Sequence, residues 1–139
     1  MDLETTAQPL AGKHLGGTGS DFVVAEWRQA GTHMGDEPVM VAPLHVHYSD
    51  DESWYVLEGT LCVRRGDEVI TCHAGSGVLV PKGMAHTFWN PSPDPCRYLL
   101  IMTARIYDLI SQLHKPGRTM TAAELFESHD SALVGPTPM

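Results

Sequence analysis

The sequence predicts an all-β domain, either a sandwich or a barrel, and three observations support this class. Short apolar runs recur at a regular spacing from residue 22 to about residue 104. Turn-forming residues, chiefly glycine, proline and aspartate, separate these runs. The chain has 139 residues, of which 42% are hydrophobic, so it is long enough for one domain with a core of its own.

The N-terminal residues 1–20 are rich in glycine, threonine and small polar residues, and we expect them to form a flexible arm. The first strand is expected at residues 22–27, and a loop follows at residues 30–37. Further strands are expected near residues 38–47, 52–58, 60–65, 68–73, 77–81, 86–90 and 96–104. The β domain would therefore occupy residues 21–104.

Residues 105–139 have a different pattern, which predicts a helical extension. Apolar residues at positions 106, 109, 110 and 113 have helical spacing, and Pro116-Gly117 would end that helix. Thr121 and Glu124 form a capping-box pattern for a second short helix that reaches about His129. We expect these helices to cover one edge or mouth of the β domain, and a lid over its cavity is the alternative.

The composition excludes several classes of function. A net charge of −8 argues against binding to nucleic acid or to anionic membrane surfaces. No apolar run approaches the length of a membrane span, and the N-terminus lacks the pattern of a signal peptide, so a cytoplasmic protein is expected. An odd number of cysteines argues against a disulfide framework. A hairpin turn at Gly66-Asp67 would pair Cys62 with Thr71, and Leu61 with Cys72.

The most informative feature is a set of metal-ligating side chains in two separate segments. In the first segment, His45 and His47 are two residues apart, so on a strand both imidazoles point to the same face. On a helix they would lie roughly 200° apart and could not share a metal. A polar loop follows, and Glu52 opens the next strand, which can bring its carboxylate back beside the histidines.

The second segment reads as strand, turn and strand. A short apolar run at residues 78–80 leads into the turn-forming sequence Pro81-Lys82-Gly83. His86 then opens another short strand, in which Phe88 shares its face. Three imidazoles and one carboxylate can occupy one side of a transition metal and leave positions open for a ligand.

Together the two segments resemble the two signature motifs of the cupin superfamily. The first motif matches at His45, His47, Glu52 and Gly59, and it departs at its opening glycine, where Val39 stands. The second motif matches at every signature position, namely Gly75, Pro81, Gly83, His86 and Asn90. The resemblance implies an antiparallel jelly-roll β-barrel that binds one divalent transition metal (Fe, Ni, Mn, Cu or Zn) through His45, His47, Glu52 and His86.

Alternation along the strands predicts the surroundings of the metal. If Glu52 faces the interior, Trp54 and Val56 do so too, and Phe88 and Val41 would share the same cavity. These four side chains would form an apolar, partly aromatic wall for a substrate. Filling of a small barrel is the alternative role for them. Glu52 can be a plain metal ligand or can also act as a catalytic base that takes a proton from a bound hydroxyl group.

The chain is most similar to small single-domain cupins of the quercetin-dioxygenase-like group. This similarity implies a dioxygenase acting on an enolic or phenolic small molecule. Two alternatives remain open, a redox-neutral enzyme of the polyketide-cyclase type and a non-catalytic small-molecule binder. Homodimers are usual among similar cupins, and the outward-facing Tyr55 and Leu57 would suit an interface between sheets.

Overall fold

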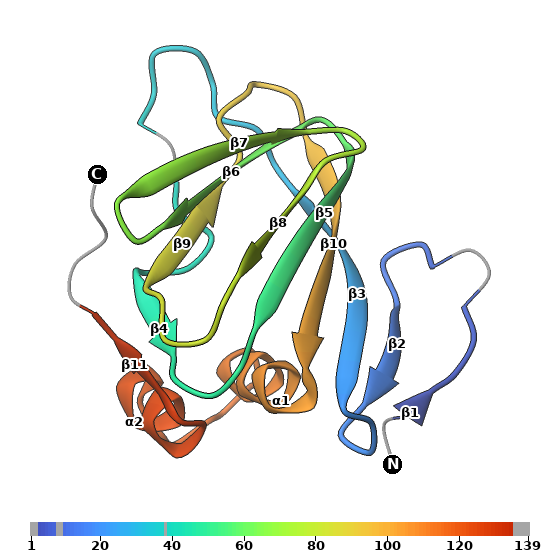
Figure 1. The fold of residues 1–139 in the computed structure, drawn as a ribbon, viewed down its shortest axis with the longest axis vertical. Coiled ribbons are helices and arrows are strands. Elements are labelled where there is room, and N and C mark those ends of the chain that lie inside the picture. Colours follow the sequence, from blue (N-terminus) through green and yellow to red (C-terminus); the bar gives the residue numbers. More distant parts are fainter. Residues whose placement is uncertain (1–2, 8–9, 38, 135–139) are drawn as a thin grey trace.

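A computed structural model describes residues 3–7, 10–37 and 39–134. Within these residues the strands form two antiparallel sheets that face each other, and two helices lie together at one end (Figure 1). The strands are β1 (Leu3–Glu4), β2 (His14–Gly17), β3 (Phe22–Gln29), β4 (His45–His47), β5 (Glu52–Glu58), β6 (Thr60–Arg65), β7 (Glu68–His73), β8 (Gly77–Val80), β9 (His86–Trp89), β10 (Cys96–Thr103) and β11 (Ser131–Leu133). The helices are α1 (Ala104–Leu113) and α2 (Ala122–Ser128).

The order of strands is β1-β2-β3-β10-β5-β8 in the larger sheet and β11-β4-β9-β6-β7 in the smaller one. The predicted all-β class and the jelly-roll arrangement are confirmed, although the two sheets do not close into a continuous barrel. The core lies between the sheets, and strict alternation of buried residues is clearest along β10. Along β10, the residues at positions 96, 98, 100 and 102 are buried, whereas the residues between them are only half-buried. Trp54 and Val56 on β5 are fully buried in the same core.

The hairpin of β6 and β7 has the predicted register. Cys62 lies opposite Thr71, and Leu61 lies opposite Cys72. The three cysteines are free thiols in buried positions. Burial raises the pKa of the Cys72 and Cys96 thiols, which favours the unreactive protonated form. These observations agree with the expected absence of a disulfide framework among the described residues and indicate that the cysteines pack in the core.

The strand expected at residues 38–47 is wrong for residues 39–44, since β4 contains only His45–His47. Pro43 lacks the backbone N–H that a ladder requires, so regular pairing begins only after it. The preceding segment is held by isolated contacts instead: the Val41 backbone N–H donates to the Phe88 carbonyl over 2.9 Å, and the Thr87 hydroxyl donates to the Ala42 carbonyl. Pro38 lies outside the described residues.

Both ends of the chain contain strands that the sequence analysis did not predict. In the expected N-terminal arm, β2 pairs with β3 and thereby extends the larger sheet. In the C-terminal extension, both expected helices are present and the capping box of Thr121 and Glu124 is confirmed. After α2 the chain adds β11 to the edge of the smaller sheet, next to β4 (Figure 1). Residues 1–2, 8–9 and 135–139 of these two regions are outside the description. Neither helix has the length and hydropathy needed to cross a bilayer.

Candidate metal centre

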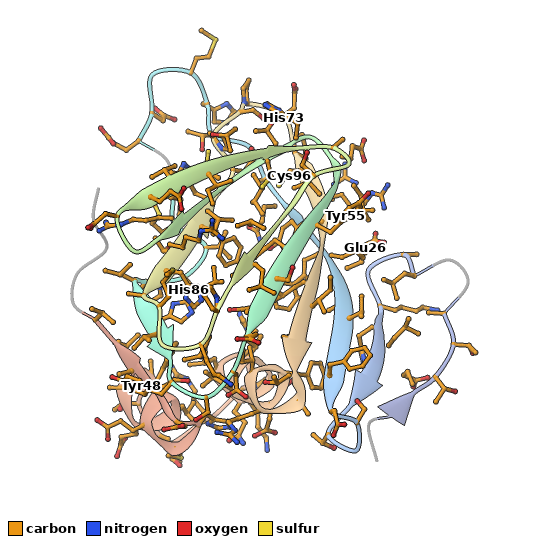
Figure 2. All side chains as sticks on the ribbon, viewed as in Figure 1. Glu26, Tyr48, Tyr55, His73, His86 and Cys96 are labelled. Carbon is orange, nitrogen blue, oxygen red and sulfur yellow. The ribbon has the colours of Figure 1, made fainter. Side chains whose placement is uncertain are left out.

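The four predicted ligands converge between the two sheets. His45 and His47 come from β4, and His86 on the neighbouring β9 lies directly opposite His45. Glu52 is the first residue of β5 and reaches the cluster from the other sheet. All four are buried, and their ligand atoms lie within 4.8 Å of one another. Figure 2 shows the His86 side chain in the interior, between the sheets.

The Nδ1 atom of each imidazole contacts a hydrogen-bond partner outside the cluster. This contact fixes the direction in which the ring presents its Nε2 atom. His45 Nδ1 donates to the Pro43 carbonyl over 2.6 Å, and His86 Nδ1 donates to the Met84 carbonyl over 3.0 Å. A carbonyl oxygen can only accept, so these Nδ1 atoms carry the proton. His47 Nδ1 contacts the Ser131 hydroxyl at 2.7 Å. In each ring the Nε2 atom is therefore left to bind a metal.

The chemistry of this donor set fits a bound cation. The Glu52 Oε1 atom lies 3.0 Å from His86 Nε2 and 3.4 Å from His47 Nε2. If the rings are neutral with Nδ1 protonated, lone pairs of nitrogen and carboxylate oxygen face one another across the cluster. His47 Nε2 is also buried without a hydrogen-bond partner. A divalent transition metal held by His45, His47, Glu52 and His86 would satisfy all of these atoms.

The pKa values of two ligands are shifted towards the forms that bind metal. Burial, with a smaller contribution from the charge of His86, lowers the pKa of His45 to about 3. Burial alone would raise the pKa of Glu52, but its contacts with His47 and His86 outweigh that effect and lower the pKa to about 2. At neutral pH, His45 is therefore a neutral imidazole and Glu52 is a carboxylate.

The ligands open onto an apolar pocket of about 190 Å³. His45, His47 and Glu52 line it, together with one further ionisable residue, His114. The remaining lining residues are apolar: Trp27, Val41, Ala42, Pro43, Phe88, Leu100, Ile106, Leu109, Ile110, Leu113, Ala122 and Phe126. A wider hollow of about 600 Å³ shares Val41 and His114 with this pocket but contains none of the four ligands. The apolar pocket is therefore the candidate site.

The structure divides the four residues expected to contact a substrate into two pairs. Val41 and Phe88 line the pocket. Trp54 and Val56 face the interior, as alternation predicted, but they are fully buried and do not line the pocket. The Trp54 ring packs behind the site, with its centroid 5.2 Å from that of Phe88 and 5.7 Å from that of His86.

The sequence analysis missed the residues that close the pocket. The Phe126 ring on α2 lies 5.3 Å from the His45 ring and 6.4 Å from the His47 ring, nearly parallel to the latter. The apolar face of α1 forms another part of the pocket wall, with Ile106, Leu109, Ile110 and Leu113. Helical spacing had revealed that face, but nothing in the pattern showed what the face covers.

Comparisons with known proteins agree with this fold. The Cupin domain family profile matches residues 33–102. Among curated proteins, the chain is 31% identical over 62 residues to a mannose-1-phosphate guanylyltransferase from Salmonella muenchen, a match that covers 45% of this chain but only 13% of that protein.

Among solved structures, KdgF from a Halomonas species aligns with a TM-score of 0.56 and 18% identity, over 70% of this chain and 80% of that one. A cupin-superfamily sugar phosphate isomerase from Silicibacter pomeroyi aligns with a TM-score of 0.51 and 24% identity, over 60% of this chain and 51% of that one. These two likenesses concern the fold.

Proposed function

The chain belongs to the Cupin domain family, and from this premise we propose that it is a metal-dependent enzyme for a small, apolar, oxygen-bearing molecule. The observation that carries the proposal is the opening of a three-histidine, one-glutamate cluster onto an apolar pocket of about 190 Å³. No lysine or arginine lines this pocket, so a phosphate or carboxylate group held away from the metal would find neither of these side chains to pair with. For that reason the sugar-phosphate chemistry in the names of two similar proteins is not extended to this chain.

The lining favours a flat, aromatic or enolic substrate. Phe88, Phe126 and Trp27 supply aromatic contact, and the aliphatic residues of α1 exclude water from the rest of the pocket. Val41 contributes to the same wall. A hydroxyl or enol oxygen of the substrate would point at the ligand cluster, which supplies most of the ionisable side chains of the lining.

A bound metal would supply either activation of O2, if it is redox-active, or polarisation of a substrate oxygen as a Lewis acid. Glu52 is the residue placed to accept a proton. Its low pKa keeps it ionised at neutral pH, the form that can take a proton from an enol or phenol. The same low pKa makes it a weak base, so ligation of the metal is its first role and proton transfer its second.

Our preferred reaction is dioxygenation of an enolic or phenolic substrate, as in the quercetin-dioxygenase-like group of cupins. The support for it is the apolar pocket, which suits both O2 and a flat substrate. The second candidate is a redox-neutral cyclisation or isomerisation. It is favoured by the ionised Glu52, because a carboxylate beside a polarised oxygen is sufficient for proton transfer without O2.

We also propose that the protein is a homodimer that pairs through the outer face of its larger sheet. Tyr55 and Leu79 on this face are 40% and 49% exposed, and Phe22 is 62% exposed. Tyr55 lies opposite Leu99, which is half-buried on the same face. A second copy would remove this apolar surface from water.

The proposal is tested by reconstituting metal-free protein separately with Fe(II), Ni(II), Mn(II), Cu(II) and Zn(II). O2 uptake is then followed with flavonols and with simple enolic diketones. O2 uptake by wild type with a redox-active metal, together with no uptake by His47→Ala, supports the dioxygenase reaction. Absence of uptake with every metal, together with tight retention of zinc, would replace it with the redox-neutral reaction. In Glu52→Gln, unchanged turnover with metal still bound would exclude Glu52 as the base.

A further inference from the structure

The C-terminal segment 121–134 lies outside the region that matches the cupin family, yet it contacts the ligand cluster. Strand β11 pairs antiparallel with β4, so that Ser131 lies opposite His47 and Leu133 lies opposite His45. Two more backbone hydrogen bonds extend this pairing, from Tyr48 N to Asp130 O over 2.9 Å and from Val134 N to Leu44 O over 3.0 Å. The ligand strand β4 is therefore held between β9 and the C-terminal segment.

The Ser131 hydroxyl has a fixed direction. It donates its own proton to the His129 carbonyl over 3.1 Å. Its oxygen is then free to accept, and it receives the Nδ1–H of His47 over 2.7 Å. Ser131 is 3% exposed and His47 is 2% exposed, so water does not compete for this contact.

This arrangement sets His47 apart from the other two imidazoles. His45 and His86 donate to carbonyls only two residues earlier in the chain, so their own turns orient them. His47 depends on a residue 84 positions away. The contact that its Nδ1 atom makes therefore exists only while the C-terminal segment is docked.

Several contacts dock this segment. His129 Nε2 lies 2.7 Å from Asp108 Oδ2, which joins the end of α2 to α1. Leu125 and Phe126 are buried against Leu109 in a small apolar cluster of their own. Phe126 also packs on the rings of His45 and His47. Docking of the segment and the geometry of the metal centre are thus physically linked.

We propose that Ser131 is a positioning residue of the metal centre, which holds His47 with Nδ1 protonated and Nε2 directed at the metal. Metal affinity then depends on the docked C-terminal segment, and bound metal in turn stabilises the docking. This inference rests on the metal-binding part of the proposed function but not on the reaction.

The test compares the affinity for Co(II) alone, by competition with a chelating dye, in wild type, Ser131→Ala and Ser131→Thr. Loss of a partner that orients a metal-bound histidine typically costs about 10- to 100-fold in affinity. We expect Ser131→Ala to lose affinity in that range, and Ser131→Thr, which keeps the hydroxyl, to recover most of it. Ser111→Ala is the control, because its exposed hydroxyl bonds the Tyr107 carbonyl within α1, away from the C-terminal segment.

A second variant separates orientation from docking. Asp108→Asn weakens the contact with His129 but leaves the Ser131 hydroxyl in place. Nitrogen-15 NMR of the imidazoles should show His47 losing its defined Nδ1–H tautomer in Ser131→Ala and keeping it in Asp108→Asn. Binding of Co(II) by Ser131→Ala within about twofold of wild type would overturn the inference. Failure of wild type to bind Co(II), Zn(II) or Ni(II) would instead overturn the metal centre itself.

Discussion

Acidification from pH 7 to pH 5 should destabilise the metal-free protein through His45 in particular. The pKa of this histidine is about 3 in the folded protein, where it is buried, against 6.5 for an ordinary histidine in the unfolded chain. At pH 5 the unfolded chain binds a proton at this residue and the folded protein does not. The unfolded state therefore binds more protons, so the free energy of unfolding falls as the pH falls from about 6.5 to about 3.

The expected magnitude at pH 5 follows from the distance of that pH from the unfolded pKa. A difference of 1.5 pH units at roughly 1.4 kcal/mol per unit gives about 2 kcal/mol. This value holds for any folded pKa below about 4, because the folded protein is then unprotonated at pH 5. Glu52 contributes little in this window: its folded pKa is about 2 against a usual 4.5, so its contribution is present above pH 4.5 and is lost only as the pH falls towards 2.

The assay is urea denaturation of chelator-treated protein at pH 7 and pH 5, in wild type and in His45→Asn. Asparagine cannot titrate, and its amide can keep the donor that faces the Pro43 carbonyl. The decrease in unfolding free energy between the two pH values should be about 2 kcal/mol smaller in the variant than in wild type. His33→Asn is the control, since His33 is exposed in a loop away from the cluster. The reasoning fails if His45→Asn and wild type lose equal stability on acidification.

Three further predictions concern the stability of the metal-free fold, the cap of α2 and the dimer interface. Chelation of the metal should leave a β-type circular dichroism spectrum and a cooperative melt, because the buried core around Trp54, Val56 and Leu100 needs no metal; complete unfolding on chelation would show that the site is structural. Thr121→Ala removes the cap of α2 and should lower the free energy of unfolding, measured by urea denaturation, by about 1 kcal/mol. Thr119→Ala, in the exposed loop before α2, is the control and should lower the free energy of unfolding much less. Equal losses of stability in the two variants would contradict the capping role of Thr121. Tyr55→Glu should convert the expected dimer to a monomer in size-exclusion chromatography with light scattering, whereas Met34→Glu, at a loop position that is 90% exposed, should not; a dimeric Tyr55→Glu would move the interface elsewhere.

Part of the ligand cluster was predictable because the relation of His45 to His47 is local. A strand places His45 and His47 on one face, and this relation depends only on the alternation of side chains. The turn at Gly83, where φ is +83°, leads from β8 in the larger sheet to β9 in the smaller one, where His86 lies opposite His45. The contribution of Glu52 from the opposite sheet followed from a short loop and from the resemblance of both motifs to those of cupins.

The limits of strand β4 were less predictable. An apolar run from Val39 to Val46 has the composition of one long strand, but only its last residues pair. Pro43 cannot donate to a ladder, and the chain before it instead meets β9 through the Val41 amide. Composition reports a tendency towards extended structure, whereas pairing depends on which backbone donors are available.

The contact between the C-terminal segment and the metal centre could not be predicted from local sequence patterns. The capping box marked the start of α2, since a helix cap involves residues three positions apart. Nothing local to residues 131–133 predicts a strand that lies against β4, because the partner is supplied by a segment more than eighty residues earlier. Ser131 is an ordinary serine until the fold sets it opposite His47, and only then does its hydroxyl decide which nitrogen of that ring faces the metal. The ligands of this metal centre can be predicted from the sequence. The geometry of the centre also depends on Ser131, whose role cannot be predicted from the sequence.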